Sequence, residues 1–267
     1  MKTLIVPVSG GKDSQVVLSL ALKDGRPVVC VHQNTGYDHP DTYEHIKVME
    51  KFYGVNIEHT VNKFGGMFGF LDRAGYFPNS AARGCTQRLK QEPFAEWLTA
   101  KGFNASNSEI WFGMRSDESA ARANKYGDLS PDDEFSLGDI AAFYNEKKRA
   151  ELGAILCRLP IVTWGTEDVF AYLSGERAPL NPLYDRGHHR VGCYPCLLAR
   201  KAEWQLAGKD PVGRQHIKTM VALEDKWKAE GNPRKFIKVH RVWDVRDFLG
   251  DRDVRELANE ECGYCSI

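Results

Sequence analysis

The pattern of apolar and polar positions predicts alternating strands and helices in the first part of the chain. Residues 3–8 form an apolar, β-branched run that stops at a glycine pair, and residues 15–22 continue as an apolar helix start. Residues 27–31 and 55–61 predict two further strands, and residues 42–52 predict a helix between them. The order is therefore strand, glycine turn, helix, strand, helix, strand.

The alternation of predicted strands and helices continues downstream. Residues 109–114 predict a fourth strand after the amphipathic stretch 87–98, and residues 154–162 predict a fifth. A helix follows over residues 166–174, with Thr166 as its expected N-cap and acidic residues in its first turn. This alternation implies an α/β fold, in which a parallel sheet carries helices on both faces and binds ligands at the carboxyl ends of its strands.

Two segments do not fit the alternation. Residues 127–137 carry four acidic side chains and are expected to form an exposed loop between two helices. Residues 200–246 contain 12 Lys or Arg against 6 Asp or Glu, a net of +6, with Trp204, Trp227, Phe236 and Trp243 interleaved. A solvated helical face is the simpler interpretation. The alternative is a nucleic-acid surface, in which cations meet phosphates and aromatic rings stack on bases.

Composition narrows the class of protein. With 267 residues, 42% hydrophobic and 27% charged, the chain is typical of a globular protein with one large domain, or one domain and an appendage. Lys plus Arg equals Asp plus Glu at 36 each, which excludes a globally basic nucleic-acid binder. There is no apolar run of about 18 residues, and the N-terminus becomes polar too early for a signal peptide, so we expect a cytoplasmic protein without a membrane span.

The turn after the first predicted strand has the composition of an anion site. It consists of Ser9, Gly10, Gly11, Lys12, Asp13 and Ser14. Glycines let the backbone approach phosphates, and the first helical turn offers free N–H groups and a favourable dipole. Lys12 is expected to be exposed and to add charge, while the serine hydroxyls add donors. The alternative is a tight turn with an incidental lysine.

This loop resembles the PP-loop of ATP pyrophosphatases, which cleave ATP between the α and β phosphates and transfer AMP to a substrate oxygen. Later motifs resemble the phosphoadenosine phosphosulfate (PAPS) reductase branch of that superfamily. These are HQNTG at 32–36, RGCTQRLKQEP at 83–93, GMRSDESAAR at 113–122, NPLYD at 181–185 and GCYPC at 192–196. The resemblance implies an adenine nucleotide alpha-hydrolase-like domain over 1–199, followed by a basic helical C-terminal extension over 200–267 with a Cys-x-x-Cys tail.

The resemblance also implies the site residues. The catalytic residues it implies are Lys12, Ser14, Arg115 and Lys90. The nucleotide-binding residues it implies are Ser9, Gly10, Gly11, Lys12, Asp13, Ser14, Asn34, Thr35, Gly36, Arg83, Gly113, Arg115, Glu118 and Arg122. The planar fork of arginine suits phosphate oxygens, and we expect Glu118 to orient Arg115. For each arginine taken alone, a surface ion pair is the alternative.

Seven cysteines in a reducing compartment indicate metal or sulfur chemistry before disulfides. The Gly-Cys-Tyr-Pro-Cys turn brings Cys193 and Cys196 together, and Cys85 and Cys262 complete a candidate site for an iron–sulfur cluster or zinc. Reduced thiols without metal are the alternative. Cys30 and Cys157 are expected in the core, and the pair at 188–189, His-His, is expected to be a solvated loop pair rather than a metal or phosphate ligand.

The intact loop lysine favours an enzyme that consumes ATP, with Mg²⁺ offsetting phosphate charge. The chain most resembles the ATP pyrophosphatases of DNA phosphorothioation (Dnd/Ssp-type), which implies a sulfur-donating desulfurase partner and a nucleic-acid substrate, DNA rather than tRNA. A homodimer is one possible assembly. The tail at 261–263, Glu-Cys-Gly, resembles that of sulfonucleotide (PAPS/APS) reductases, so a reductase using Cys262 is an alternative. A nucleotide-binding subunit without turnover is the third hypothesis.

Overall fold

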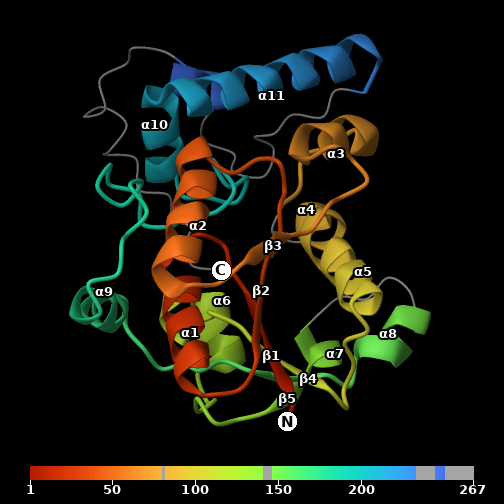
Figure 1. The fold of residues 1–267 in the computed structure, drawn as a ribbon. Helices are drawn as coiled ribbons and strands as arrows, with labels where there is room; N and C mark the ends of the chain where they lie inside the picture. The colour runs from red at the N-terminus through yellow and green to blue at the C-terminus, as the bar shows by residue number, and fades with distance from the viewer. Residues whose placement is uncertain (80–81, 141–145, 233–243, 250–267) are drawn as a thin grey trace.

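A six-stranded, mostly parallel sheet forms the centre of the fold (Figure 1). The computed structural model describes residues 1–79, 82–140, 146–232 and 244–249. The strands are β1 (Thr3–Pro7), β2 (Val28–His32), β3 (Ile57–His59), β4 (Ser108–Trp111), β5 (Phe135–Ser136) and β6 (Leu156–Arg158). Their order is β3-β2-β1-β4-β6-β5, and every pairing is parallel except that of β5 with β6. The expected α/β fold is confirmed.

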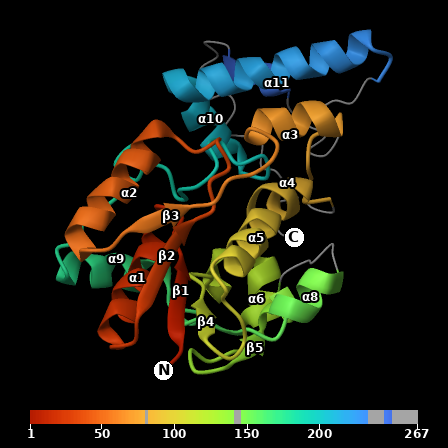
Figure 2. The same cartoon turned by 45° about the vertical axis from the view of Figure 1, so that its right-hand side comes forward.

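Side chains that alternate along the strands build two hydrophobic cores. Leu4 and Val6 of β1 point to one face of the sheet, and Ile5 between them points to the other. The first face is covered by α1 (Lys12–Lys23), α2 (Pro40–Tyr53) and α9 (Thr166–Gly175), and the second by α5 (Glu92–Ala100), α7 (Leu137–Ile140) and α8 (Glu146–Leu152) (Figure 2). Because both faces are covered, the inner strands carry apolar residues on both sides.

Shorter helices connect these layers. They are α3 (Met67–Ala74), α4 (Gly84–Thr86), a π-helical turn (Gln87–Gln91), a 3₁₀ turn (Ser116–Glu118) and α6 (Ala120–Tyr126). The π-helical turn joins α4 to α5, so residues 84–100 form one helical run with a locally widened turn that contains Lys90. Among the helices that the structure describes, none has the length and apolarity needed to cross a membrane.

The described part of the C-terminal extension consists of α10 (Lys201–Lys209), α11 (Pro211–Ala229) and a 3₁₀ turn (Val245–Leu249). Trp204 and Trp227 are almost fully buried in a further core shared with α3 and with Tyr37, which follows β2. Tyr37 stacks on His216 of α11 with ring centroids 4.6 Å apart. The two tryptophans are therefore packing residues, and a base-stacking role for them is wrong. Phe236 and Trp243 lie outside the described residues.

Three local expectations differ from the structure. The stretch 127–137 is not loop to its end, because its last residues form β5, an edge strand too short to show a period. Helix α9 has Gly165 as its N-cap, whose N–H donates to Asp168 Oδ2 at 2.7 Å, so Thr166 is not the cap. Helix α1 begins at Lys12, three residues earlier than the apolar pattern indicates, because its polar first turn belongs to the anion loop.

Candidate functional site

The loop at residues 9–14 joins the carboxyl end of β1 to α1, and two glycines allow its close packing. Gly10 has φ +74°, and a Cβ there would lie 2.7 Å from Thr42 Cγ2. Gly113, just after β4, passes so close that a Cβ would lie 2.9 Å from the backbone nitrogen of Ser14. Both positions therefore need glycine, and the role visible for Gly113 is this close approach.

Hydroxyl groups fix the shape of the loop. Ser14 Oγ accepts the Ser9 N–H at 3.0 Å and donates to the Gly11 carbonyl at 2.9 Å, while Ser9 Oγ accepts the Gly11 N–H at 3.3 Å. The N–H groups of Asp13 and Ser14 belong to the first turn of α1, where a helix has no internal acceptor for them. These two amides, together with the helix dipole, are suited to bind an anion.

Lys12 is buried rather than exposed, which corrects the sequence expectation. Its side chain is only 4% exposed, and its Nζ donates to Asp13 Oδ2 at 2.8 Å. The same ammonium lies 5.8 Å from the centroid of the Phe170 ring on α9. Burial lowers the pKa of Lys12, and the Asp13 carboxylate opposes that effect. The lysine thus has its own counter-ion inside the loop.

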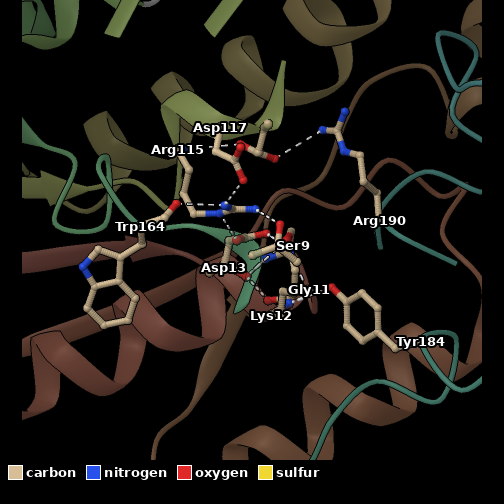
Figure 3. A network of polar contacts seen from close by, with 12 residues as sticks. Ser9, Gly11, Lys12, Asp13, Arg115, Asp117, Trp164, Tyr184 and Arg190 are labelled. Carbon is tan, nitrogen blue, oxygen red and sulfur yellow. Dashed lines mark hydrogen bonds and ion pairs between the residues drawn. The ribbon is translucent and has the colours of Figure 1, made fainter. Parts of the chain in front are cut away.

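Arg115 binds that counter-ion from the other side (Figure 3). Its side chain is 2% exposed, and its Nε donates to Asp13 Oδ1 at 2.6 Å. Nη1 donates to the Trp164 carbonyl at 2.9 Å and to Asp117 Oδ2 at 3.2 Å, and Nη2 donates to Thr166 Oγ1 at 3.1 Å. Four of the five N–H donors of the guanidinium therefore have protein acceptors, and the side chain fixes Asp13 in place.

A group of arginines surrounds Glu118 beside the loop. Glu118 Oε2 accepts the backbone N–H of Arg115 at 3.3 Å instead of orienting its guanidinium, and the same carboxylate forms ion pairs with Arg122 and Arg190. Burial lowers the pKa of Arg122 to about 10, and the positive charges of Arg190 and Arg83 add to the effect. This local excess of positive charge favours an anionic ligand. The sequence did not identify Arg190 as a site residue, because its only signal there is its position just before the Cys-x-x-Cys turn.

The NPLYD segment also binds the loop. Asn181 Nδ2 donates to the Gly10 carbonyl at 3.1 Å, and the Tyr184 hydroxyl oxygen accepts the Lys12 N–H at 2.9 Å. The sequence identifies this segment only as part of a motif, because no local pattern reveals a contact across more than 170 positions. Asn181 and Tyr184 are therefore additions to the candidate site.

Residues 34–36 shape the turn after β2. Asn34 Oδ1 accepts the Gly36 N–H at 2.8 Å and the Tyr43 hydroxyl at 2.9 Å. Thr35 is buried, and its hydroxyl lies 3.4 Å from Asp38 Oδ2 and 3.6 Å from Cys193 Sγ. Thr35 is thus in direct contact with Cys193, one cysteine of the candidate metal site.

The charge of Cys196 shifts the pKa of Cys85, Cys193 and Lys90, and we call these four residues the cysteine cluster. Burial raises the pKa of Cys193 to about 12, while the Lys90 ammonium opposes this rise. The Cys193 thiolate, and after it the Asp38 carboxylate, raises the pKa of Lys90. The charges that act most strongly on Lys90 are therefore those of Cys193 and Asp38, and its role at a phosphate stays a prediction.

The cluster has the donor chemistry of a soft-metal site. Five cysteines are described, and all are free thiols. Three thiolates, with a fourth ligand, are what an iron–sulfur cluster or zinc requires. As arranged in the described residues, no group of three or more His, Cys, Asp or Glu side chains could hold a metal ion. Cys262, the expected fourth ligand, lies outside the described residues.

The remaining histidine and cysteine expectations have mixed outcomes. His188 is buried, not solvated: its Nδ1 lies 2.6 Å from Glu203 Oε2, and its Nε2 lies 3.3 Å from the Tyr194 hydroxyl. His189 is exposed as expected. Cys30 and Cys157 are buried in the two sheet cores, which confirms their structural assignment.

Comparison with known proteins gives a consistent picture. Residues 3–199 match the family model of the phosphoadenosine phosphosulfate reductase domain. The chain is 24% identical to the adenosine 5'-phosphosulfate reductase of Allochromatium vinosum over 203 residues, which cover 74% of this chain and 70% of the relative. It is 30% identical to sulfate adenylyltransferase subunit 2 of Agrobacterium fabrum over 184 residues, or 65% of this chain and 55% of that one.

A solved structure shows the same fold. The crystal structure of phosphoadenylyl-sulfate reductase from Candida auris, a phosphate complex, superposes with a TM-score of 0.51 at 18% identity. The superposition covers 73% of this chain and 83% of the other. The sheet and its flanking helices are therefore of the adenine nucleotide alpha-hydrolase-like kind.

Proposed function

The chain belongs to the phosphoadenosine phosphosulfate reductase domain family, and we propose that within it the protein is an ATP pyrophosphatase. It would cleave ATP to AMP and pyrophosphate and adenylate a substrate oxygen for sulfur insertion. The observation that carries this proposal is the complete anion loop, in which Lys12 and two free helix amides are held ready by Asp13 and Arg115. A loop lysine can offset the negative charge of a leaving pyrophosphate, so its presence supports an enzyme that releases pyrophosphate.

The proposed reaction uses the loop to stabilise the leaving group. The β and γ phosphates accept hydrogen bonds from the first-turn amides of Asp13 and Ser14, and Lys12 offsets their charge. A substrate oxygen attacks the α phosphorus, a new P–O bond forms, and the α–β anhydride bond breaks with release of pyrophosphate. Arg122 and Arg190, which form ion pairs with Glu118, would offset charge on the α phosphate or on an anionic acceptor. Mg²⁺ bound with ATP would neutralise further phosphate charge.

The sulfur step is the more specific part of the proposal. The outer sulfur of a persulfide, delivered by a desulfurase partner in the cytoplasm, would attack the activated phosphorus, and AMP would leave with the former oxygen. A second thiol of the donor system would then cleave the S–S bond, which leaves the sulfur on phosphorus and a disulfide on the donor. DNA phosphorothioate modification is the reaction of this kind that the sequence motifs favour, with DNA as the acceptor. Cys85, Cys193, Cys196 and Cys262 would hold an iron–sulfur cluster, which would supply a site for sulfur or electrons when bound, or zinc, which would supply a Lewis acid without redox chemistry.

A sulfonucleotide reductase is the second candidate. It is favoured by the similarity to an adenosine 5'-phosphosulfate reductase and by Cys262 in its Glu-Cys-Gly context. In that reaction the Cys262 thiolate attacks the sulfur of the sulfonucleotide, and sulfite is later released by a reducing thiol. The intact loop would then have no pyrophosphate to hold.

One experiment separates these functions. The full chain is incubated anaerobically with α-labelled ATP, Mg²⁺, DNA and a persulfide donor, and in parallel with adenosine 5'-phosphosulfate or its 3'-phosphorylated form and a dithiol. We expect AMP from ATP, dependent on the acceptor, and no sulfite. Sulfite release without ATP cleavage would establish the reductase. If neither AMP nor sulfite is formed, a nucleotide-binding subunit without turnover is favoured.

A further inference from the structure

Tyr184 reaches the phosphate loop from a segment far away in the chain. Its hydroxyl oxygen accepts the Lys12 N–H at 2.9 Å, and a Cβ placed on Gly11 would lie 3.3 Å from that oxygen. Figure 3 shows the phenol ring directed at the loop from a different side than Arg115. The tyrosine hydroxyl therefore accepts from one of the backbone N–H groups with which an anion loop binds its ligand.

The position of Tyr184 is fixed by its surroundings. The Tyr184 N–H donates to the Asn181 carbonyl at 3.0 Å, and the side chain of Asn181 is bonded in turn to the Gly10 carbonyl. The Tyr184 ring meets the Phe170 ring edge-on with centroids 5.6 Å apart. A side chain held by its own segment and by a neighbouring ring forms part of a built site.

The hydroxyl has an unused proton. Its oxygen accepts from Lys12, and within the described part of the chain its own O–H has no acceptor. Burial raises the pKa of Tyr184, which keeps the phenol protonated at neutral pH. A phenol that accepts one hydrogen bond becomes a stronger donor for the next.

We propose that Tyr184 is a phosphate-binding residue, whose O–H donates to a non-bridging oxygen of the polyphosphate held in the loop. This inference rests on the proposed function, because the ligand is the triphosphate of ATP or the pyrophosphate product. The Lys12 N–H then contributes indirectly to phosphate binding, because it donates to the Tyr184 hydroxyl that itself donates to the phosphate. The opposite possibility is that the hydroxyl only fills the empty loop and leaves when a phosphate enters.

The substitution Tyr184→Phe separates these two outcomes by sign. It keeps the ring and its contact with Phe170 and removes only the hydroxyl. We expect the dissociation constants for Mg²⁺-pyrophosphate and for α,β-methylene-ATP, measured by titration calorimetry, to rise about 10- to 100-fold, as for loss of a hydrogen bond to a charged group. Equal or tighter binding, with the Lys12 N–H now free for the ligand, would overturn the inference.

Two controls make the result specific. Tyr172→Phe on α9 removes a phenol hydroxyl that bonds Ser19 and Lys23 in the later turns of α1, and it should leave both dissociation constants unchanged. Tyr184→Leu keeps an apolar side chain without a hydroxyl and should bind no more tightly than the phenylalanine variant. If the unaltered protein binds neither ligand, the proposed function fails and the inference fails with it. If it binds and Tyr184→Phe binds equally well, only the inference fails.

Discussion

In the phosphate loop Lys12 bonds a carboxylate directly, whereas in the cysteine cluster the negative charges that act on Lys90 come from cysteine sulfur and from Asp38. Asp13 lies between Lys12 and Arg115 and bonds both. Around Lys90 the neighbours are Asp38 and thiols such as Cys193, whose pKa burial raises to about 12. Lys12 therefore has its counter-ion before a ligand arrives.

The cluster gains its negative charge only when its thiols lose their protons. Bound metal deprotonates thiols, and Lys90 would then offset part of the charge of the thiolates. Under the proposed function the two sites are two devices with separate tasks: one would hold phosphate, and the other would handle sulfur or a metal. Substitutions in one device should leave the other intact, and the following predictions test that separation.

The largest effect is expected for Lys12→Met, which keeps the buried aliphatic stem and removes the charge. ATP cleavage to AMP and pyrophosphate should fall about 100- to 1000-fold, as when a preorganised donor to a developing charge is removed. The metal content of the protein should not change. Steady-state AMP release and metal analysis on the same preparation measure both, and a loss of metal would contradict the separation.

The matching change in the other device is Cys193→Ser with Cys196→Ser. Anaerobically purified protein should show the visible absorbance of an iron–sulfur cluster, or contain zinc, and the double variant should lose it. ATP cleavage without sulfur transfer should remain. The control is Cys30→Ser with Cys157→Ser, in the sheet cores, which should retain the metal. Neither iron nor zinc in fresh protein would leave the cluster as thiols only.

A smaller effect, on stability, is expected for Arg115→Leu. The substitution leaves Asp13 with only one of its two buried partners and three other acceptors without their donor, so the free energy of unfolding should fall by about 3 kcal/mol. Arg122→Leu removes a more exposed arginine and should cost about 1 kcal/mol. Urea unfolding followed by circular dichroism compares them, and equal losses would show that Arg115 has no special structural role.

A further effect, on the pH dependence of stability, is expected at His45 of α2, whose Nε2 lies 3.3 Å from Gln15 Oε1 of α1. Burial lowers the pKa of His45 to about 4 from 6.5, so between these pH values the unfolded state binds more protons than the folded state. The free energy of unfolding should therefore decrease by about 2 to 3 kcal/mol as the pH falls from 6.5 to 4. In His45→Gln this decrease should be smaller by that amount, and parallel stability curves for the two proteins would contradict the assignment.

The sequence predicts best what is local. The apolar runs of β1, β2 and β4 and the glycine turn after β1 are visible within about ten residues, and all were predicted. The pairing of β5 with β6 could not be predicted, because a two-residue edge strand has no period.

For the candidate site, too, the sequence predicts local features but not contacts between distant segments. The loop residues and the cysteines are recognisable by type and spacing, but the burial of Lys12 depends on Asp13 and on Phe170, which comes from another helix. The contact of Tyr184 with the loop depends on the complete fold. Residue type therefore indicated the chemistry, and the neighbours of each side chain became known only from the structure.

The most direct test of the central claim is to follow which bond of ATP is broken. The protein is incubated with Mg²⁺, DNA and a persulfide donor, with ATP labelled at the α phosphate in one reaction and at the γ phosphate in the other. We predict that the α label appears in AMP and the γ label in pyrophosphate, and that Lys12→Met forms neither. Labelled ADP with inorganic phosphate, or full AMP formation by the Lys12 variant, would contradict cleavage at this loop.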